Sequence, residues 1–450
     1  MLLDTNNTKI QITCQQYVCT EFRFQNNDTE LWFEFDSHQD TKDVYCQYCD
    51  KNSVEIHDYF STKLRDMPVF PGIRQYLRIR RHKYKCRVCN RVFAEDIPFK
   101  EPDVRVTKRA ADFIREMLSL GLSSSSIARF TGVHWDTIRT IHSTIMEETL
   151  SKRFKYLKES GYRPKYLAVD EFAIHKGQTY ATCVMDLNLG EVLWVGKGRN
   201  MEEFRHFFEE YDMDYLSEVE AVAMDMNASY NLLFKEYMPQ VDIVYDRYHL
   251  QALFNTNVLS IVRVQEAKKH SETSKDMRKF WKDETEILLK KEWRQKYNDE
   301  LDKYKSVKQS RWLLLTNKRN LSLVQQESLN TILEEHKQLA ICYAMKEELN
   351  RLFEITDIHE AESRWKVWLK AARESCIKPL VTFAKTQEKN LEGLISHAAH
   401  PITTAKLEGL NNKIKVAKRV GYGFRNDDYF FTLVRYISIP FVYIQIPPKT

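Results

Sequence analysis

The long stretch between Gln240 and Lys378 contains neither glycine nor proline. These two residues interrupt regular structure more strongly than any others. The stretch is rich in Lys, Glu, Leu, Arg and Gln, which favour helices. Its apolar residues recur at helical spacing, for example at Leu288, Leu289, Trp293, Tyr297 and Leu301. The sequence therefore predicts an all-helical block, which we place at residues 251–400.

The residues before this block, 162–250, alternate between strand-like and helix-like patterns. We expect strands at residues 166–172, 179–187, 191–195, 219–224 and 241–245. We expect amphipathic helices at residues 201–211 and 229–237. Strands and helices in this order suit a mixed sheet flanked by helices. The predicted class is α/β, with several domains along the 450 residues.

Bulk composition narrows the class of protein further. With 43% hydrophobic residues the chain can bury sizeable cores, so disorder is not expected away from the ends. The polar start, Met1 to Ile10, does not resemble an export signal, and no apolar run reaches the length of a membrane span. We therefore expect a cytoplasmic protein. A net charge of +5 is too small to identify a nucleic-acid partner, so the distribution of charge must decide.

Two C-x-x-C pairs lie near the start, Cys46 with Cys49 and Cys86 with Cys89. Each pair places two thiolates one tight turn apart, as tetrahedral zinc requires. Chance spacing and redox chemistry are alternatives, but the doubling of the pair disfavours both. We expect a zinc ribbon over residues 41–103, with a structural Zn²⁺, after a β-type segment of unknown role at residues 1–40.

A dense basic run surrounds the second cysteine pair, and no acidic residue occurs from Met67 to Ala94. A solvated strand face would normally mix charges of both signs. Contact with DNA phosphates is therefore the favoured interpretation. The residues expected to make this contact are Arg74, Arg78, Arg80, Arg81, Lys83 and Lys85.

Residues 104–160 have helical periodicity and the form of a helix-turn-helix. Serines before Ile127 would cap the first helix, and Gly132 would supply the turn. Val133 and Ile138 would lock the second helix against the first. An ordinary helical hairpin is the alternative, and the neighbouring basic run favours DNA binding. The second helix would offer to a DNA groove His134, Trp135, Thr137 and Arg139.

Acidic side chains are associated with three of the expected strands. Asp170 lies inside an otherwise apolar strand, and Asp225 and Asp246 each end one. Capping of a following helix would explain a single aspartate. Three in one sheet instead favour a cation site of the kind that cleaves phosphodiesters with two metal ions.

These strands, the Asp246-Arg247-Tyr248-His249 element and the helical block together resemble DDE transposases with a ribonuclease-H-like core. The resemblance is most specific at the segment Lys406-Leu407-Glu408-Gly409-Leu410-Asn411-Asn412-Lys413-Ile414-Lys415, which is followed by Arg419 and Gly421-Tyr422-Gly423-Phe424-Arg425. With the ribbon and the helix-turn-helix, the chain looks like the ISL3 family of bacterial insertion-sequence transposases.

The resemblance implies a ribonuclease-H-like core at residues 162–250, interrupted by the helical insertion at 251–400 and completed by residues 401–450. Asp170, Asp225 and Glu408 would then hold two Mg²⁺ or Mn²⁺ ions. Asp246 and His249 would support the active site without binding metal.

Glu408 also fits this role by its spacing. On a helix, Glu408, Asn412, Lys415 and Arg419 would share one face. Glu408 would face the metal, and the other three would face DNA phosphates. A surface helix of mixed charge is the alternative interpretation of this segment.

The implied function is a DNA transposase that binds the ends of an insertion sequence and catalyses strand cleavage and strand transfer. Its partner would be double-stranded DNA, on which we expect a homodimer or higher oligomer at the bacterial nucleoid. One alternative is a DNA-binding regulator with an inactive ribonuclease-H-like domain. Another is a nuclease of the same fold that cuts without joining.

Overall fold

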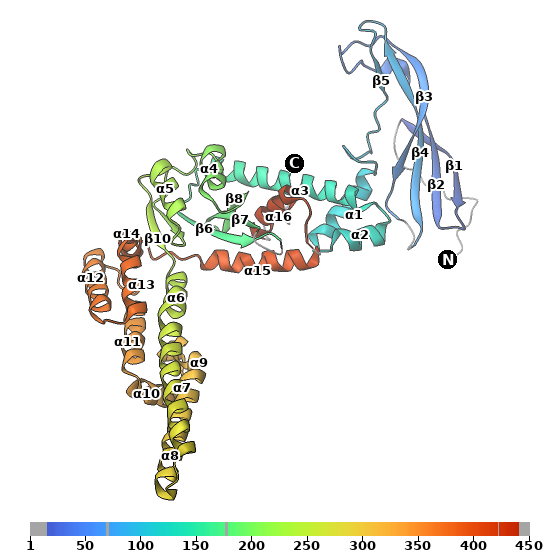
Figure 1. Cartoon of the computed structure of the whole chain (residues 1–450). Coiled ribbons are helices and arrows are strands. Elements are labelled where there is room, and N and C mark those ends of the chain that lie inside the picture. Colours follow the sequence, from blue (N-terminus) through green and yellow to red (C-terminus); the bar gives the residue numbers. More distant parts are fainter. Residues whose placement is uncertain (1–15, 69–71, 176–178, 422, 441–450) are drawn as a thin grey trace. The chain divides into compact units, whose positions relative to one another are not determined.

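The structure is a computed structural model that describes residues 16–68, 72–175, 179–421 and 423–440. The chain divides into two compact units (Figure 1). One contains residues 1–156 and 415–450, and the other contains residues 157–414. Both contain helices and a mixed sheet, which confirms the α/β class.

A five-stranded sheet forms the start of the first unit, in the order β1-β2-β4-β3, with β5 beside β4. β2 and β4 are parallel, and the other pairs are antiparallel. Phe33, Phe35 and Ile79 are among the side chains that form its core. The strands are β1 (Tyr17–Gln25), β2 (Glu30–Ser37), β3 (Val54–Arg65), β4 (Arg74–Cys86) and β5 (Val92–Ala94).

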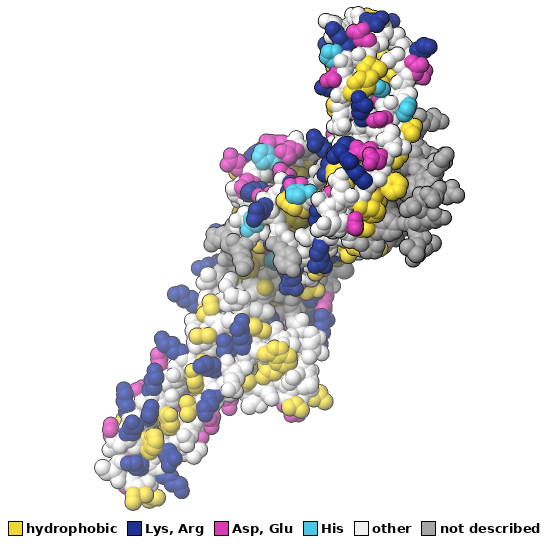
Figure 2. Space-filling model, turned by 90° about the vertical axis from the view of Figure 1, so that its right-hand side faces the viewer, with side chains coloured by type: hydrophobic (Ala, Val, Ile, Leu, Met, Phe, Trp, Pro, Cys, Tyr) yellow, Lys and Arg dark blue, Asp and Glu magenta, His cyan; other side chains and the backbone are white. Residues whose placement is uncertain are grey.

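Strand β4 divides the basic run between its two faces, because successive side chains on a strand point in opposite directions. Arg74, Arg78 and Arg80 lie on one face, and Arg81, Lys83 and Lys85 lie on the other. The buried face of the strand changes between Ile79 and His82. Over these strands basic and acidic side chains are interspersed on the side seen in Figure 2.

Three helices follow the sheet, α1 (Lys108–Ser119), α2 (Ser124–Thr131) and α3 (Trp135–Glu159). Ser123 caps α2 by accepting a hydrogen bond from the Ser126 amide, and Gly132 ends it with a φ of +66°. Ile127, Val133 and Ile138 are all buried, in one apolar cluster that also contains residues of α1. Arg65 of β3 donates a 2.6 Å hydrogen bond to the Thr131 carbonyl and so ties the sheet to the end of α2.

The second unit contains a sheet in the order β10-β9-β6-β7-β8. The elements follow one another as the sequence predicts: three strands, a helix, a strand, a helix and a strand. β6, β9 and β10 are parallel, whereas β7 and β8 are antiparallel. The elements are β6 (Tyr166–Ala173), β7 (Tyr180–Asp186), β8 (Glu191–Lys197), α4 (Met201–Glu210), β9 (Ala221–Met224), α5 (Ala228–Tyr237) and β10 (Asp242–Tyr245).

Residues 251–400 form helices, as the lack of glycine and proline predicts. The short π-helix Asn255–Leu259 joins the first two helices. Trp365, Trp368 and Phe383 are among the buried residues that pack these helices together. The helices are α6 (Arg247–Phe254), α7 (Ser260–Asp283), α8 (Ile287–Gln309), α9 (Arg311–Leu315), α10 (Leu323–Glu335), α11 (Lys337–Leu352), α12 (Ile358–Glu374), α13 (Lys378–Glu388) and α14 (Leu391–Ala399).

Helices α7 and α8 form a long hairpin whose tip extends beyond the other helices of this unit (Figure 1). Lys and Arg side chains are frequent on the side of the hairpin seen in Figure 2. Phe280, Ile287 and Leu288 near the tip are largely exposed. In the part of the chain that the structure describes, no helix has the length and apolar character needed to span a membrane.

Candidate active site

The register of the second sheet brings three aspartates to one level. Tyr166 pairs with Ala221, and Ala221 pairs with Asp242, on parallel strands. Four residues further along each strand are Asp170, Asp225 and Asp246. Because parallel strands end at the same edge of a sheet, these aspartates gather at the carboxyl edge of β6, β9 and β10.

Asp170, Asp225 and His249 form the cluster at this edge. Each offers a ligand atom, and these atoms lie within 4.8 Å of one another. They line a pocket of about 530 Å³, which also contains Glu171 and Tyr180. The sequence places all three residues in the active site, and the structure brings them together.

The Asp170 carboxyl group is partly buried in an environment that opposes its charge. Burial raises the pKa of Asp170 to about 6, and the nearby Asp225 carboxylate adds to the rise. The Glu171 amide donates a 2.7 Å hydrogen bond to Asp170 Oδ1, which partly offsets this effect. A buried carboxylate beside a second one favours the binding of a cation.

His249 provides positive charge at the site through its contact with Asp225. Its Nδ1 lies 2.9 Å from Asp225 Oδ2. This hydrogen bond raises the pKa of His249 to about 9, although burial opposes the rise. The imidazole is therefore charged at neutral pH and balances part of the carboxylate charge.

Asp246 is buried and accepts hydrogen bonds on both carboxylate oxygens. Its Oδ1 accepts from the amides of Tyr248 (2.7 Å) and His249 (3.1 Å) and so caps helix α6. Its Oδ2 accepts from the Thr404 amide (2.9 Å) and the Thr404 hydroxyl (2.7 Å). Thr404 lies immediately before helix α15 (Ala405–Val420), so Asp246 fixes the start of that helix to the sheet.

Helix α15 reaches the cluster through Asn411. The Asn411 amide nitrogen lies 3.0 Å from Asp170 Oδ2 and donates a hydrogen bond to it. Glu408 lies one turn earlier on α15, on the exposed side next to Asn411. Among the described residues, the cluster of ligand atoms within 4.8 Å does not include the Glu408 carboxylate. The sequence predicts Glu408 as a ligand, but the contact that the structure shows is made by Asn411.

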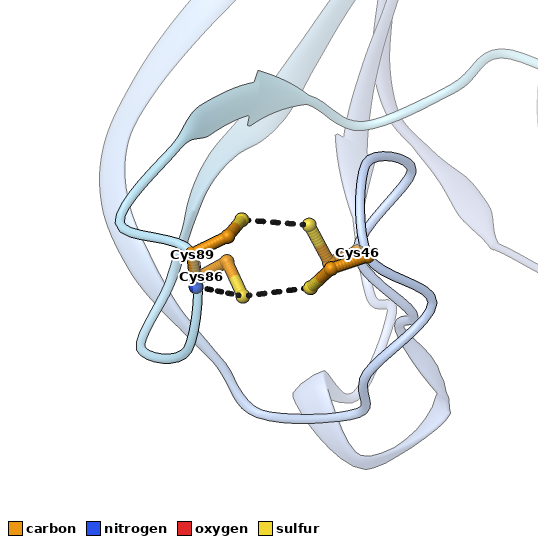
Figure 3. Close-up of side chains that lie close together, drawn as sticks. Cys46, Cys86 and Cys89 are labelled. Atoms are coloured by element: carbon orange, nitrogen blue, oxygen red, sulfur yellow. Dashed lines mark hydrogen bonds between the residues drawn. The ribbon is translucent and has the colours of Figure 1, made fainter.

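The four cysteines of the two C-x-x-C pairs converge in the first unit (Figure 3). Cys46 Sγ lies 3.6 Å from Cys89 Sγ, and Cys49 Sγ lies 3.6 Å from Cys86 Sγ. Zn–S bonds of about 2.3 Å in a tetrahedron separate the sulfurs by about 3.8 Å. The spacing therefore suits Zn²⁺, as the sequence predicts.

The two cysteine turns have the same backbone form. Asp50 follows Cys49 with a φ of +53°, and Asn90 follows Cys89 with a φ of +56°. Asp and Asn adopt this left-handed conformation more readily than most residues. Amides of Val88 and Cys89 approach Cys86 Sγ, and they lower the pKa of Cys86 to about 7. A thiolate at this position is suited to bind metal.

The residues expected to contact DNA lie at several places. His134 and Trp135 are exposed at the start of α3, and Thr137 and Arg139 are half-buried there. Arg139 lies over the Trp135 ring at 5.9 Å. On α15 the expected residues are all exposed, namely Asn412, Lys415 and Arg419.

Comparison with known proteins identifies the family. Residues 167–434 match the ISL3 family of the DDE class, whose description is transposase. This chain belongs to the ISL3 family of transposases. The resemblance inferred from the Glu408 segment and the strand aspartates is confirmed.

Individual transposases match this chain over most of their length. A transposase for insertion sequence element IS1001 from Bordetella parapertussis is 31% identical over 394 residues, which cover 88% of each chain. A transposase for insertion sequence element IS1557 from Mycobacterium tuberculosis is 20% identical over 328 residues, 70% of this chain and 68% of that protein. The first match extends well beyond the residues that define the family.

Two contacts of this transposase are absent from the sequence-based prediction. Asn411 follows Glu408 by three residues, and residues at this spacing lie on the same side of a helix. The sequence therefore contains a signal that relates Asn411 to Glu408. Thr404 gave no such signal, because its partner Asp246 lies 158 positions away.

Proposed function

We propose that this transposase binds the ends of its insertion sequence and cuts and joins DNA with two Mg²⁺ or Mn²⁺ ions. Asp170, Asp225 and Glu408 would hold the ions. The observation that supports this assignment best is the meeting of Asp170 and Asp225 in one pocket, with Asn411 of α15 bound to Asp170. Glu408 belongs to the same helix, one turn away.

The chemistry of the donor atoms suits hard divalent cations. Carboxylate oxygens are preferred by Mg²⁺ and Mn²⁺. Paired ions of this kind activate an attacking oxygen and stabilise the leaving oxygen of a phosphodiester. Asn411 and the Glu171 amide orient the Asp170 carboxylate. His249 holds Asp225 and limits charge repulsion in the pocket.

A cleavage assay on labelled DNA from the flanks of the coding sequence tests this function. We expect strand cuts at the element end with Mg²⁺ and none with EDTA, followed by joining of the freed 3′ end to a second DNA. Binding without any cutting would instead indicate a regulator with an inactive ribonuclease-H-like domain. Cutting without joined products would indicate a nuclease.

The first unit would supply recognition of the element end. We propose that the cysteine cluster binds a structural Zn²⁺ and that α2 and α3 act as a helix-turn-helix. The exposed start of α3, with His134 and Trp135, supports entry of that end into a DNA groove. The capped and tightly packed turn at Gly132 supports a fixed angle between the helices.

Loss of one cysteine should remove the zinc. We expect about one zinc per chain in the wild type and almost none in Cys86→Ser, because three thiolates leave the tetrahedral site incomplete. Elemental analysis measures the zinc, and amide exchange over residues 46–51 and 86–91 measures the accompanying loss of order. Cys376→Ser, which removes an exposed cysteine elsewhere, is the control. Full zinc content in Cys86→Ser would contradict this assignment.

The face of β4 that carries Arg74 and Arg80 is the better candidate for DNA contact. Both side chains are exposed. Arg78 on the same face pairs with Glu34 at 3.0 Å, and Arg81 on the other face donates a 3.0 Å hydrogen bond to Thr62. These two arginines therefore have partners within the sheet.

Replacing Arg74 and Arg80 by alanine should weaken DNA binding and flatten its salt dependence. Each lost phosphate contact lowers the slope of log affinity against log salt by about one. Fluorescence anisotropy at several salt concentrations measures this slope. Arg87→Ala is the control, since Arg87 pairs with Glu55 at 3.1 Å. An unchanged slope in the double variant would exclude this face.

A further inference from the structure

Arg199 and Tyr180 form a cationic and aromatic pair beside the carboxylate pocket. Tyr180, at the start of β7, lines the pocket together with Asp170 and Asp225. The Arg199 guanidinium carbon lies 4.6 Å from the centre of the Tyr180 ring. An arginine over the face of a tyrosine is held there by cation–π attraction. The pair places a positive charge next to a group of acidic side chains.

The backbone that presents Arg199 is tightly constrained. Gly198 has a φ of +93°, and a Cβ there would overlap the Glu203 carboxylate. The Gly198 amide donates a 2.7 Å hydrogen bond to the Tyr180 carbonyl. The Arg199 amide donates to Glu203 Oε2 at 3.2 Å. Arg199 and Tyr180 are thus joined through both main chain and side chain.

The same turn is linked to the pocket by buried hydroxyl groups. Thr182 Oγ1 donates a 2.8 Å hydrogen bond to the Gly198 carbonyl and lies 2.9 Å from the Tyr230 hydroxyl. Tyr230 in turn donates a 3.0 Å hydrogen bond to Glu171 Oε1. The chain of contacts fixes the position of Arg199 relative to a carboxylate that lines the pocket.

Arg199 has no carboxylate partner within 4.0 Å among residues whose placement is described. Its side chain is exposed, so a ligand can reach it. The nearby Arg205 provides a contrast. It also lies over a tyrosine, Tyr237 at 5.6 Å, but it pairs with Glu236 at 2.8 Å. The guanidinium of Arg205 is therefore neutralised by direct contact, whereas that of Arg199 acts on the Glu171 carboxylate only through space and can bind an external anion.

We propose that Arg199 binds the DNA phosphate adjacent to the one that is cut, with Tyr180 as the positioning residue that holds its guanidinium. Arginine recognises phosphate through planar, charge-assisted hydrogen bonds. The positive guanidinium offsets the repulsion between the phosphate and the carboxylates of the pocket, so a phosphate bound to it aligns the strand across the pocket. This inference rests on the proposed function, since it specifies how that site holds its substrate.

DNA in which one phosphate at a time is replaced by an uncharged analogue tests this contact. DNA from the element end is made with one methylphosphonate at each position around the cut, and its binding is measured in Ca²⁺ and its cleavage in Mg²⁺. For the full-length wild type, we expect a methylphosphonate at one position next to the cut to lower binding and cleavage about tenfold each. On unmodified DNA, Arg199→Ala should bind and cleave about tenfold less well than the wild type. A methylphosphonate at the position next to the cut should not weaken the variant further, whereas methylphosphonates at the other positions should affect it as they affect the wild type.

Two further variants separate this contact from general damage. Arg205→Ala should keep the wild-type response at every position. Tyr180→Phe should behave as the wild type because it keeps the ring, whereas Tyr180→Ala should lose part of the effect. If Arg199→Ala retains the wild-type response at every position, the contact does not exist. If the wild type binds with this pattern in Ca²⁺ but never cuts in Mg²⁺, the proposed function fails and the contact stands.

Discussion

Asp170→Asn is expected to abolish metal-dependent strand cleavage, by about a thousandfold or more, while specific DNA binding persists. The substitution keeps the shape of the side chain and removes the charge that would bind metal. Metal ions contribute several kcal/mol to charge stabilisation in such transition states, and about 1.4 kcal/mol corresponds to tenfold in rate. Single-turnover cleavage of a labelled element end measures the loss, and gel shift measures the binding.

Asp170→Asn should not unfold the protein. Burial raises the pKa of Asp170 to about 6 from an ordinary value of 3.8. The Asp170 carboxyl group therefore holds its proton more tightly in the folded chain than in the unfolded chain. Ionisation therefore weakens folding, with a cost that grows between about pH 4 and pH 6 and is complete at neutral pH. Without metal, the variant should unfold at the wild-type temperature or above it. Mg²⁺ should raise the unfolding temperature of the wild type alone.

Asp242→Asn is the matched control for Asp170→Asn. It removes the same charge from the opposite edge of the same sheet, at the start of β10. The Asp242 carboxylate lies 3.1 Å from His400 Nε2, on the protein surface. We expect wild-type cleavage from this variant. If Asp170→Asn cuts DNA as fast as Asp242→Asn does, Asp170 is not a metal ligand.

Much of the second unit could be predicted because its pattern is local. Strand and helix periods gave the order from β6 to β10, and the lack of breakers gave the helices after Gln240. The meeting of Asp170 with Asp225 followed from one rule, that parallel strands end at the same edge. In the hairpin, apolar residues at helical spacing are not all buried, and Leu288 is 72% exposed. Two helices packed only against each other bury one side of each helix and leave the other side in solvent.

Other features depend on contacts that a local pattern does not contain. The sequence indicates one basic surface, but the alternation of β4 directs Arg80 and Arg81 to opposite faces. The spacing of Asn411 relates it to Glu408, but only the folded chain shows its contact with Asp170 of β6. The contact between Thr404 and Asp246 spans the whole helical insertion, so only the folded chain shows it.

Asp246 connects the two parts of the site that the insertion separates in sequence. Its Oδ1 caps the helix that carries His249, and its Oδ2 holds Thr404 at the start of the helix that carries Glu408. Both oxygens are engaged by amides and a hydroxyl, and the side chain is only 1% exposed. These contacts support the proposal that Asp246 positions the site rather than binds metal.

Asp246→Asn should therefore weaken both folding and catalysis. Asparagine caps helices as well as aspartate, so its oxygen can still accept from Tyr248 and His249. Its NH₂ group would then face the Thr404 amide, leaving a buried N–H without an acceptor. We expect a loss of about 2 kcal/mol in the free energy of unfolding. A small displacement of α15 should lower cleavage about a hundredfold.

The Mg²⁺ dependence of cleavage distinguishes positioning from simple instability. If Asp246 places Glu408, the Mg²⁺ concentration for half-maximal cleavage should rise in Asp246→Asn, even far below its unfolding temperature. Thr404→Val is the graded control, because it removes only the hydroxyl and leaves the Thr404 amide bound to Asp246. It should show a smaller shift in the same direction, and Thr404→Ser should restore wild-type behaviour. A destabilised Asp246→Asn that cuts at the wild-type rate with unchanged Mg²⁺ dependence would limit Asp246 to a structural role.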